Sequence, residues 1–215
     1  MDFSEKRKRL VEGLKQRGYV RSPAVEKAML SVPREVFIPE RKKVVAYVDR
    51  PIDIGSGQTI SAPHMVAIMT EVMQLSSGQK VLEVGTGSGY HAAVVSQIVG
   101  KQGHVYSVER YEHLAEVARQ RLKKSNIENV SVVMGDGSLG LKDFAPYNCI
   151  YVTCSAPSVP DPLKNQVCVG GRIVIPIGQV TGELMVLTKE KTGFYEKTYG
   201  GCAFVPLIGK YGFDE

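Results

Sequence analysis

A glycine-rich turn follows a short apolar segment near the middle of the chain. Residues 81–84 read Val-Leu-Glu-Val, and Gly85, Gly87 and Gly89 follow before a helical pattern starts at Tyr90. A dinucleotide-binding turn would need glycine where Tyr90 stands, and a P-loop would need a Gly-Lys-Ser/Thr sequence, which is absent. The turn therefore excludes both of these phosphate-binding loops and is by itself only a weak indication of a binding site.

Three acidic residues stand where consecutive strands are expected to end. Glu83 precedes the turn, Glu109 ends the second predicted strand 24 residues after Gly85, and Asp136 lies in the third strand's closing turn, 135–137. Singly, Glu109 or Asp136 would be interpreted as a turn or helix-cap acid. An acid at Glu109 can, however, accept hydrogen bonds from both hydroxyls of a ribose. Together the carboxylates indicate a positively charged nucleoside, and S-adenosylmethionine, with its sulfonium and amino groups, fits.

The elements that must position these residues alternate between strands and helices from Lys80 onward. Amphipathic runs of period 3.6 predict helices at 90–99 and 111–124, and short apolar runs predict strands. This alternation predicts an α/β fold with a doubly wound, mostly parallel, Rossmann-like sheet that binds ligands beyond the carboxyl ends of its strands. The seven predicted strands are 81–84, 105–108, 130–134, 149–153, 173–177, 184–187 and 204–207.

The first 75 residues show helical patterns instead. Ser4 and Ser22 are expected to cap two helices, the first of which ends at Gly18. A third helix carries a methionine-rich apolar face from Met65 onward, which we interpret as core packing. The segment 49–61 is rich in Gly and Pro and is expected to be a loop.

The composition bounds the class of protein. With 215 residues, 43% of them hydrophobic, the chain can bury a sizeable core, which excludes disordered, collagen-like and coiled-coil proteins. We expect one domain over 1–215, with an N-terminal helical region at 1–75 and an α/β core at 76–215. Neither a membrane span nor a secretory signal is predicted.

Cysteine usage favours a reducing compartment. The four cysteines form no C-x-x-C pair and lie near no histidine cluster, so neither a disulfide framework nor a zinc site is expected. We therefore predict a cytoplasmic location and no metal ligands. The cysteines are Cys149, Cys154, Cys168 and Cys202.

Positive charge gathers in the first 50 residues, which hold 13 Lys and Arg against 7 Asp and Glu. Such a region could contact nucleic acid or an acidic partner. No aromatic residues are interleaved with the charges, so we favour a solvated helix face and expect no nucleic-acid or membrane partner.

Several segments match one family in order along nearly the whole chain. The most specific reads Gln58-Thr59-Ile60-Ser61-Ala62-Pro63-His64-Met65, whereas the glycine turn of 81–90 is shared by many methyltransferases. Further matches are 32–37, 147–153, 170–178 and 204–207. On these segments the chain resembles the protein-L-isoaspartate O-methyltransferases, repair enzymes of the class I methyltransferase fold.

The resemblance implies methyl transfer from S-adenosylmethionine to the free α-carboxyl of L-isoaspartyl residues in damaged proteins and peptides. The products would be S-adenosyl-L-homocysteine and a methyl ester that closes to a succinimide, whose hydrolysis returns some normal aspartyl. Ser61 falls on the family's active-site serine, next to the methyl donor, and Thr59 and Ile60 fall on its neighbours along the cofactor and substrate groove. Glu83 stands where some relatives have Asp. The predicted cofactor-binding residues are Thr59, Ile60, Ser61, Glu83, Gly85, Thr86, Gly87, Gly89, Glu109, Asp136 and Gly137, of which Ser61 is also the predicted catalytic residue.

The implied chemistry needs no general base. An α-carboxyl has a pKa of about 3.3–3.7, so it is already a nucleophile near neutral pH. No G-x-S-x-G elbow makes Ser61 a hydrolase nucleophile. We assign Ser61 to positioning the carboxylate, with a helix cap before Ala62 and Pro63 as an alternative or additional role. For His64 a structural place in the first helical turn is favoured.

Two alternatives stay open. The same fold could methylate another acceptor, such as RNA or a small molecule, although the Asn/Asp-Pro-Pro-aromatic motif of base methylation is missing at 153–157. The chain could also be a cofactor-binding module without catalysis. The favoured hypothesis remains an enzyme that acts on isoaspartyl proteins and peptides as a monomer.

Overall fold

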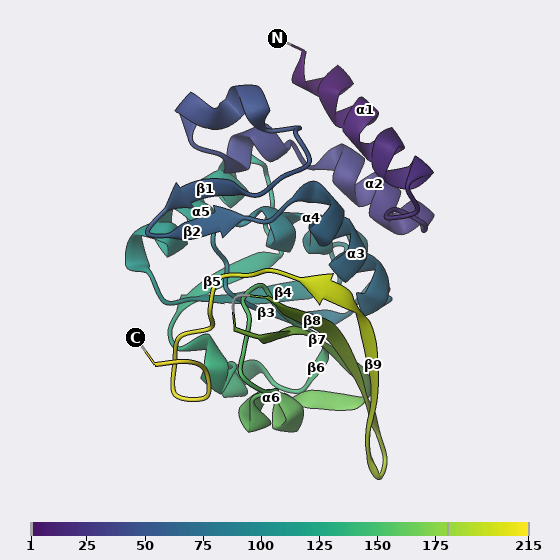
Figure 1. Cartoon of the computed structure of the whole chain (residues 1–215), viewed down its shortest axis with the longest axis vertical. Coiled ribbons are helices and arrows are strands. Elements are labelled where there is room, and N and C mark those ends of the chain that lie inside the picture. Colours follow the sequence, from purple (N-terminus) through teal and green to yellow (C-terminus); the bar gives the residue numbers. More distant parts are fainter. Residues whose placement is uncertain (1, 180, 215) are drawn as a thin grey trace.

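The computed structural model describes residues 2–179 and 181–214 and contains a seven-stranded sheet (Figure 1). The strand order is β5-β4-β3-β6-β7-β8-β9. The first five strands in this order run parallel, β8 pairs antiparallel with β7, and β9 pairs antiparallel with β8. The predicted doubly wound, mostly parallel fold is therefore confirmed. The strands are β3 (Lys80–Val84), β4 (His104–Glu109), β5 (Val130–Met134), β6 (Tyr147–Val152), β7 (Val167–Gly178), β8 (Gly182–Glu190) and β9 (Gly193–Cys202).

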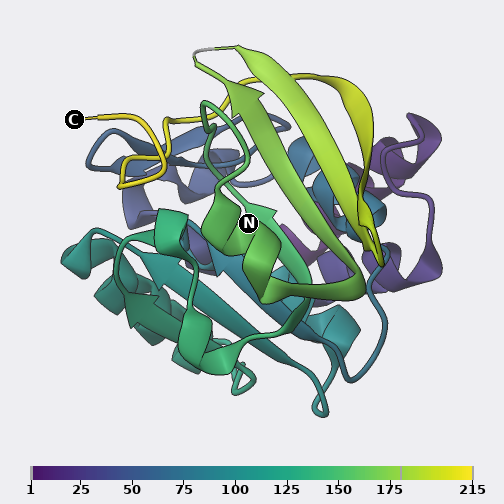
Figure 2. The same cartoon turned by 90° about the horizontal axis from the view of Figure 1, so that it is seen from below.

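Both faces of the sheet are buried. Successive side chains of a strand point to opposite faces, and neighbouring residues of β3 lie in two different cores. Val81 lies in one core with α3 (Pro63–Met73) and α4 (Tyr90–Val99). Leu82 lies in a second core with α6 (Asp161–Gln166), which is seen on the near face in Figure 2. This two-sided burial explains why the parallel strands read as continuous apolar runs. The helices α4 and α5 (Glu112–Lys124) occupy the predicted ranges.

The N-terminal residues form an additional layer outside α3 and α4 (Figure 1). It consists of α1 (Phe3–Gln16), α2 (Pro23–Ser31) and the short 3-10 helices η1 (Arg34–Phe37) and η2 (Glu40–Val45). Ser22 caps α2 as predicted, but the predicted cap at Ser4 is wrong. Asp2 caps α1 instead, because its carboxylate accepts a hydrogen bond from the backbone N–H of Glu5 at 3.1 Å.

The expected loop at 49–61 contains a hairpin, which corrects the sequence-based interpretation. Its strands are β1 (Ile52–Gly55) and β2 (Gln58–Ile60). Ser56 and Gly57 both take positive φ, as a two-residue hairpin turn requires. The hairpin buries Ile52 and Ile60, so its apolar residues outweigh the turn-forming composition.

The seventh strand was predicted at 204–207, and this is wrong as well. A two-residue turn at Lys191 and Thr192 allows β9 to pair antiparallel with β8. As an edge strand exposed on most of its length, β9 lacks the apolar alternation that would have revealed it. Residues 204–207 form one isolated bridge, Ser155 to Pro206, and lie beside the carboxyl ends of the parallel strands. The remaining short 3-10 helices are η3 (Gly137–Leu139) and η4 (Lys142–Phe144).

Candidate active site

A pocket opens where β3, β4 and β6 end, at the point where the strand order reverses. This is the position at which doubly wound sheets bind ligands. Nine of the eleven predicted cofactor residues line it: Thr59, Ile60, Ser61, Glu83, Gly85, Thr86, Gly87, Glu109 and Gly137. Gly89 and Asp136 do not.

The glycine turn has a different constraint at each glycine. Gly85 has φ +94°, and a Cβ there would overlap the hydroxyl of Thr153. Gly87 has φ +52°, and a Cβ there would meet only Ile54, at 3.6 Å, so this side of the turn is open. Gly89 precedes α4 and approaches Ala118, with 3.3 Å between a would-be Cβ and the Ala118 Cβ. Gly87 therefore leaves room for a ligand, whereas Gly89 leaves room for a neighbouring helix.

Glu109 ends β4 and is 5% exposed. Its Oε2 accepts a hydrogen bond from the backbone N–H of Gly87 at 2.8 Å. Its Oε1 accepts from the N–H groups of Arg110 and Tyr111, both at 3.0 Å. Because a carboxylate offers about four lone-pair sites, three N–H donors leave acceptor capacity for a ligand.

Glu83 is fully buried at the end of β3. The Tyr151 hydroxyl donates to its Oε1 at 2.8 Å, and the Ser107 hydroxyl donates to its Oε2. Burial raises the pKa of Glu83 to about 8, although both hydrogen bonds oppose the shift. A cationic group bound beside Glu83 would reverse this effect and favour the carboxylate.

Asp136 does not line the pocket that Gly137 lines, and its carboxylate is engaged by other residues. Its Oδ1 accepts from the N–H and the hydroxyl of Ser138, and its Oδ2 accepts from the N–H of Lys210 at 2.8 Å. Burial opposes these hydrogen bonds, yet they hold the pKa of Asp136 below its ordinary value. Asp136 thus caps η3 and ties the C-terminal segment to it.

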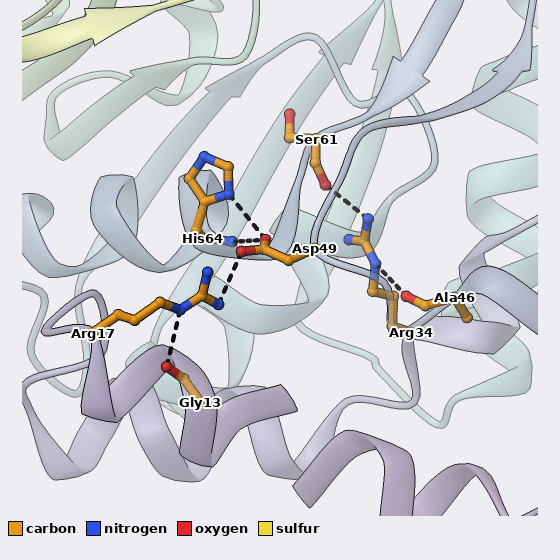
Figure 3. Close-up of polar contacts among 7 residues, drawn as sticks. All are labelled: Gly13, Arg17, Arg34, Ala46, Asp49, Ser61 and His64. Carbon is orange, nitrogen blue, oxygen red and sulfur yellow. Dashed lines mark hydrogen bonds and ion pairs between the residues drawn. The ribbon is translucent and has the colours of Figure 1, made fainter. Parts of the chain in front are cut away.

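The hairpin delivers Thr59, Ile60 and Ser61 to the other side of the pocket. The cap of α3 is Ala62, without a side-chain hydrogen bond, so the alternative role of Ser61 as a helix cap is wrong. The Ser61 carbonyl accepts a hydrogen bond from Nη2 of Arg34 at 2.8 Å (Figure 3).

His64 lies in the first turn of α3, as expected. Its backbone N–H and its Nδ1 each lie 2.9 Å from Oδ1 of Asp49, and Arg17 pairs with Oδ2 of Asp49 at 3.0 Å. Burial opposes these contacts, but they keep the pKa of Asp49 below its ordinary value. In Figure 3 the His64 ring and the Ser61 hydroxyl point to the same side, away from Arg17.

The sequence interpretation missed several pocket residues. Arg110 and Tyr111 directly follow Glu109 and also line the pocket. Extending the predicted site by two residues beyond the end of this strand would have found them. His91 also lines it; burial lowers the pKa of His91 to about 3, and its Nε2 lies 3.0 Å from the Thr70 hydroxyl. The C-terminal wall consists of Val205, Pro206 and Leu207, from the segment predicted as a strand, and of Ile208, which follows it.

Residues 2–179 and 181–214 contain neither a metal-binding cluster nor a membrane-spanning helix. No group of three or more His, Cys, Asp or Glu side chains in this part of the chain could hold a metal ion. None of the helices within these ranges is both long enough and apolar enough to cross a membrane.

Comparisons with known proteins agree with this geometry. A protein-L-isoaspartate O-methyltransferase 1 of Archaeoglobus fulgidus is 54% identical over 213 residues, covering 99% of this chain and 98% of that protein. A protein-L-isoaspartate O-methyltransferase of Methanothrix thermoacetophila is 53% identical over 210 residues and covers 98% of both chains.

Solved structures show the same similarity. A Plasmodium falciparum crystal structure, described as a protein-L-isoaspartate O-methyltransferase in complex with S-adenosyl-L-homocysteine, superimposes with a TM-score of 0.85. It is 29% identical, and the match covers 94% of this chain and 98% of that chain. The family model described as protein-L-isoaspartate(D-aspartate) O-methyltransferase matches residues 5–212. The chain therefore belongs to the protein-L-isoaspartate (D-aspartate) O-methyltransferase family.

Proposed function

We propose that this enzyme transfers a methyl group from S-adenosylmethionine to the free α-carboxyl of L-isoaspartyl residues in damaged proteins and peptides. The observation that carries the proposal is a shared pocket. The family's most specific segment, with Ser61, faces the glycine turn and the two carboxylates Glu83 and Glu109 across it. The region 1–75 thus supplies Ser61, and the region 76–215 supplies the turn and both acids.

The residues present suit the cofactor. Gly87 leaves open space beside the turn, and Glu109 retains acceptor capacity for ribose hydroxyls. Glu83 provides a buried carboxyl that a cationic ligand would ionise. When bound, S-adenosylmethionine supplies an electrophilic methyl group on a positively charged sulfonium. Gly89 and Asp136 we assign to supporting the pocket from outside.

Ser61 we assign to orienting the acceptor carboxylate through its hydroxyl or its N–H. The acceptor is anionic and the donor cationic, so their charges cancel as the new bond forms, and no proton has to be removed. The work left to the chain is alignment and the exclusion of water. Ile60, Val66 and Leu207 provide apolar walls suited to that exclusion.

The oligomeric state, the cellular location and the partners are proposals as well. We infer that the enzyme acts as a monomer in the cytoplasm, on isoaspartyl proteins and peptides, with no nucleic-acid or membrane partner. All four cysteines are free, which suits a reducing compartment.

The deciding experiment is a methyl-transfer assay on two versions of one peptide that differ only in an isoaspartyl or an aspartyl residue. We expect methylation of the isoaspartyl peptide and none of its partner. Equal labelling, or labelling of RNA or a small molecule instead, would indicate another acceptor. Tight binding of S-adenosylmethionine without any methyl transfer would identify a binding module.

A further inference from the structure

Arg34 is a buried cation beside the active-site segment. It lies in η1, and its side chain is fully buried. Its Nε donates to the Ala46 carbonyl at 3.0 Å, and its Nη2 donates to the Ser61 carbonyl at 2.8 Å (Figure 3). Its guanidinium carbon lies 4.8 Å from the centre of the Tyr90 ring.

This arrangement is costly for a residue with only a packing role. Arg34 forms no ion pair within the part of the chain that the structure describes, and its buried Nη1 has no hydrogen-bond partner. Asp49, drawn nearby in Figure 3, is engaged by His64 and Arg17. A buried charge without a carboxylate partner lowers stability, and an apolar side chain of similar volume would often be more stable there.

Two residues that Arg34 contacts line the pocket. Ser61 and Tyr90 both line the pocket, whereas Arg34 does not. Figure 3 shows the Ser61 carbonyl directed at the guanidinium and the Ser61 hydroxyl directed away from it. The hydrogen bond to the carbonyl fixes the backbone at Ser61 and thus the position of the Cβ that carries the hydroxyl.

The charge of Arg34 has a natural counterpart in the reaction. The acceptor is a carboxylate held at Ser61, and a positive charge buried behind Ser61 attracts an anion there. Because the guanidinium lies outside water, that attraction is screened less than one from a surface lysine. The charge is also fixed in place before the substrate arrives, so binding requires no rearrangement of it.

We propose that Arg34 is a positioning residue for methyl transfer: it orients Ser61 through the Ser61 carbonyl and places a positive charge behind the acceptor carboxylate. This role rests on the proposed function. It predicts that Arg34 affects the acceptor more than the cofactor, because its backbone acceptors are the Ala46 and Ser61 carbonyls, and at the end of the glycine turn it contacts only the Tyr90 side chain.

The test compares Arg34→Met with Arg172→Met. Arg172 is a matched control because its Nη1 donates to the Val72 carbonyl at 3.0 Å, between β7 and α3, and it does not line the pocket. Measurements are melting temperature, the Kd of S-adenosyl-L-homocysteine by calorimetry, and kcat and KM on an isoaspartyl peptide. For Arg34→Met we expect a loss of kcat/KM on the order of tenfold or more, with a raised peptide KM and little change in Kd. Arg172→Met is expected to keep its kcat/KM wherever it remains folded.

A double-mutant cycle with Ser61→Ala separates positioning from general stability. If Arg34 acts through Ser61, the loss in the double variant is smaller than the product of the single losses. Losses that multiply would overturn the orientation of Ser61 by Arg34, and a folded Arg34→Met enzyme with unchanged kcat/KM would overturn the whole proposal. A parallel loss of cofactor affinity and turnover would do the same.

If Arg34→Met does not fold, a second pair of variants, Arg34→Lys and Arg34→Gln, tests the same role. Both keep a hydrogen-bond donor, but only lysine keeps the charge. We expect the peptide KM of Arg34→Lys to lie closer to wild type, and equal KM values would overturn the role of the charge. A wild type that is inactive on the peptide refutes the proposed function itself, whereas an active wild type with insensitive variants refutes only the role of Arg34.

Discussion

The Oε2 of Glu109 accepts a hydrogen bond from the backbone N–H of Gly87 at 2.8 Å, and this contact joins the end of β4 to the glycine turn after β3. The carboxylate predicted to bind a ribose is therefore also part of the framework that shapes the turn. Its three N–H donors hold it in place before any ligand binds. If Glu109 binds the ribose as predicted, cofactor binding and the geometry of the turn are coupled through this one side chain.

Replacing Glu109 should consequently affect both cofactor affinity and stability. We expect Glu109→Ala to weaken binding of S-adenosyl-L-homocysteine by roughly 1.5–3 kcal/mol, the contribution of hydrogen bonds to a charged group. It should also lower the melting temperature, because the Gly87 N–H loses its acceptor. Calorimetry and thermal unfolding measure the two effects. Glu112→Ala, at an exposed position three residues later, is the control. A raised peptide KM with unchanged cofactor affinity would instead place Glu109 toward the acceptor.

Glu83 should make the ligand-free protein less stable as the pH rises. Its pKa is raised by burial from 4.5 to about 8, so between these values the folded state binds a proton that the unfolded state has released. The contribution of this proton to the free energy of unfolding is fully present below the pKa that Glu83 has in the unfolded chain. It is lost as the pH rises through the pKa that Glu83 has in the folded protein. We expect Glu83→Gln to remove this fall and to melt above wild type near about pH 8, while losing cofactor affinity. A wild-type melting profile that Glu83→Gln leaves unchanged in shape would contradict the assignment.

The same carboxyl predicts proton release on cofactor binding. A cationic ligand beside Glu83 favours the ionised form, so binding near neutral pH should expel a proton from wild type and none from Glu83→Gln. Calorimetry in buffers of different ionisation enthalpy measures the number of protons released on binding. Tyr151 and His91 also lie in this region, but burial keeps both neutral, since it raises the pKa of the first and lowers that of the second. Release of the same number of protons by both proteins would assign the proton to another group.

The positions of Glu83 and Glu109 could be predicted from the sequence, because both residues lie at the carboxyl ends of parallel strands and these ends meet at one edge of the sheet. The sequence pattern did not distinguish Gly137, which lines the pocket, from Asp136, which does not: the contact of Asp136 with Ser138 is a local cap, but only the fold brings Lys210 within reach of that carboxylate. A glycine pattern likewise cannot show whether the missing Cβ leaves space for a ligand, as at Gly87, or for a packed helix.

Arg34 illustrates what remained out of reach. In the sequence it is one of many basic residues in a charged N-terminal region, and its charge predicts exposure. Only the tertiary structure shows that it is buried between the Ala46 and Ser61 carbonyls. The edge strand β9 was missed for the opposite reason, because its exposed side chains give no apolar pattern.

Asp136 should act on the pocket through the C-terminal segment. Asp136→Ala removes the acceptor of the Lys210 N–H, so residues 207–213 should exchange their amide hydrogens faster. Because Leu207 and Ile208 line the pocket, cofactor affinity should fall moderately, by less than in Glu109→Ala. Hydrogen exchange and calorimetry test this, with the exposed Asp143→Ala as control. An affinity loss without faster exchange at 207–213 would mean that Asp136 contacts the cofactor directly.

Ser61 should affect turnover and hardly affect stability. The cap of α3 is Ala62 and uses no side chain, so Ser61→Ala removes no helix cap, and its melting temperature should stay near that of wild type. If the hydroxyl orients the acceptor carboxylate, losing it should lower kcat/KM on the order of 10²-fold, the usual cost of one donor that strengthens its bond in the transition state. Cofactor affinity should change much less. Melting temperature, Kd and turnover are measured on one preparation, beside Ser56→Ala, which alters the turn of the same hairpin and does not line the pocket. Full turnover in Ser61→Ala would assign orientation of the carboxylate to the backbone N–H groups of this segment, and the hydroxyl would then have no part in the reaction.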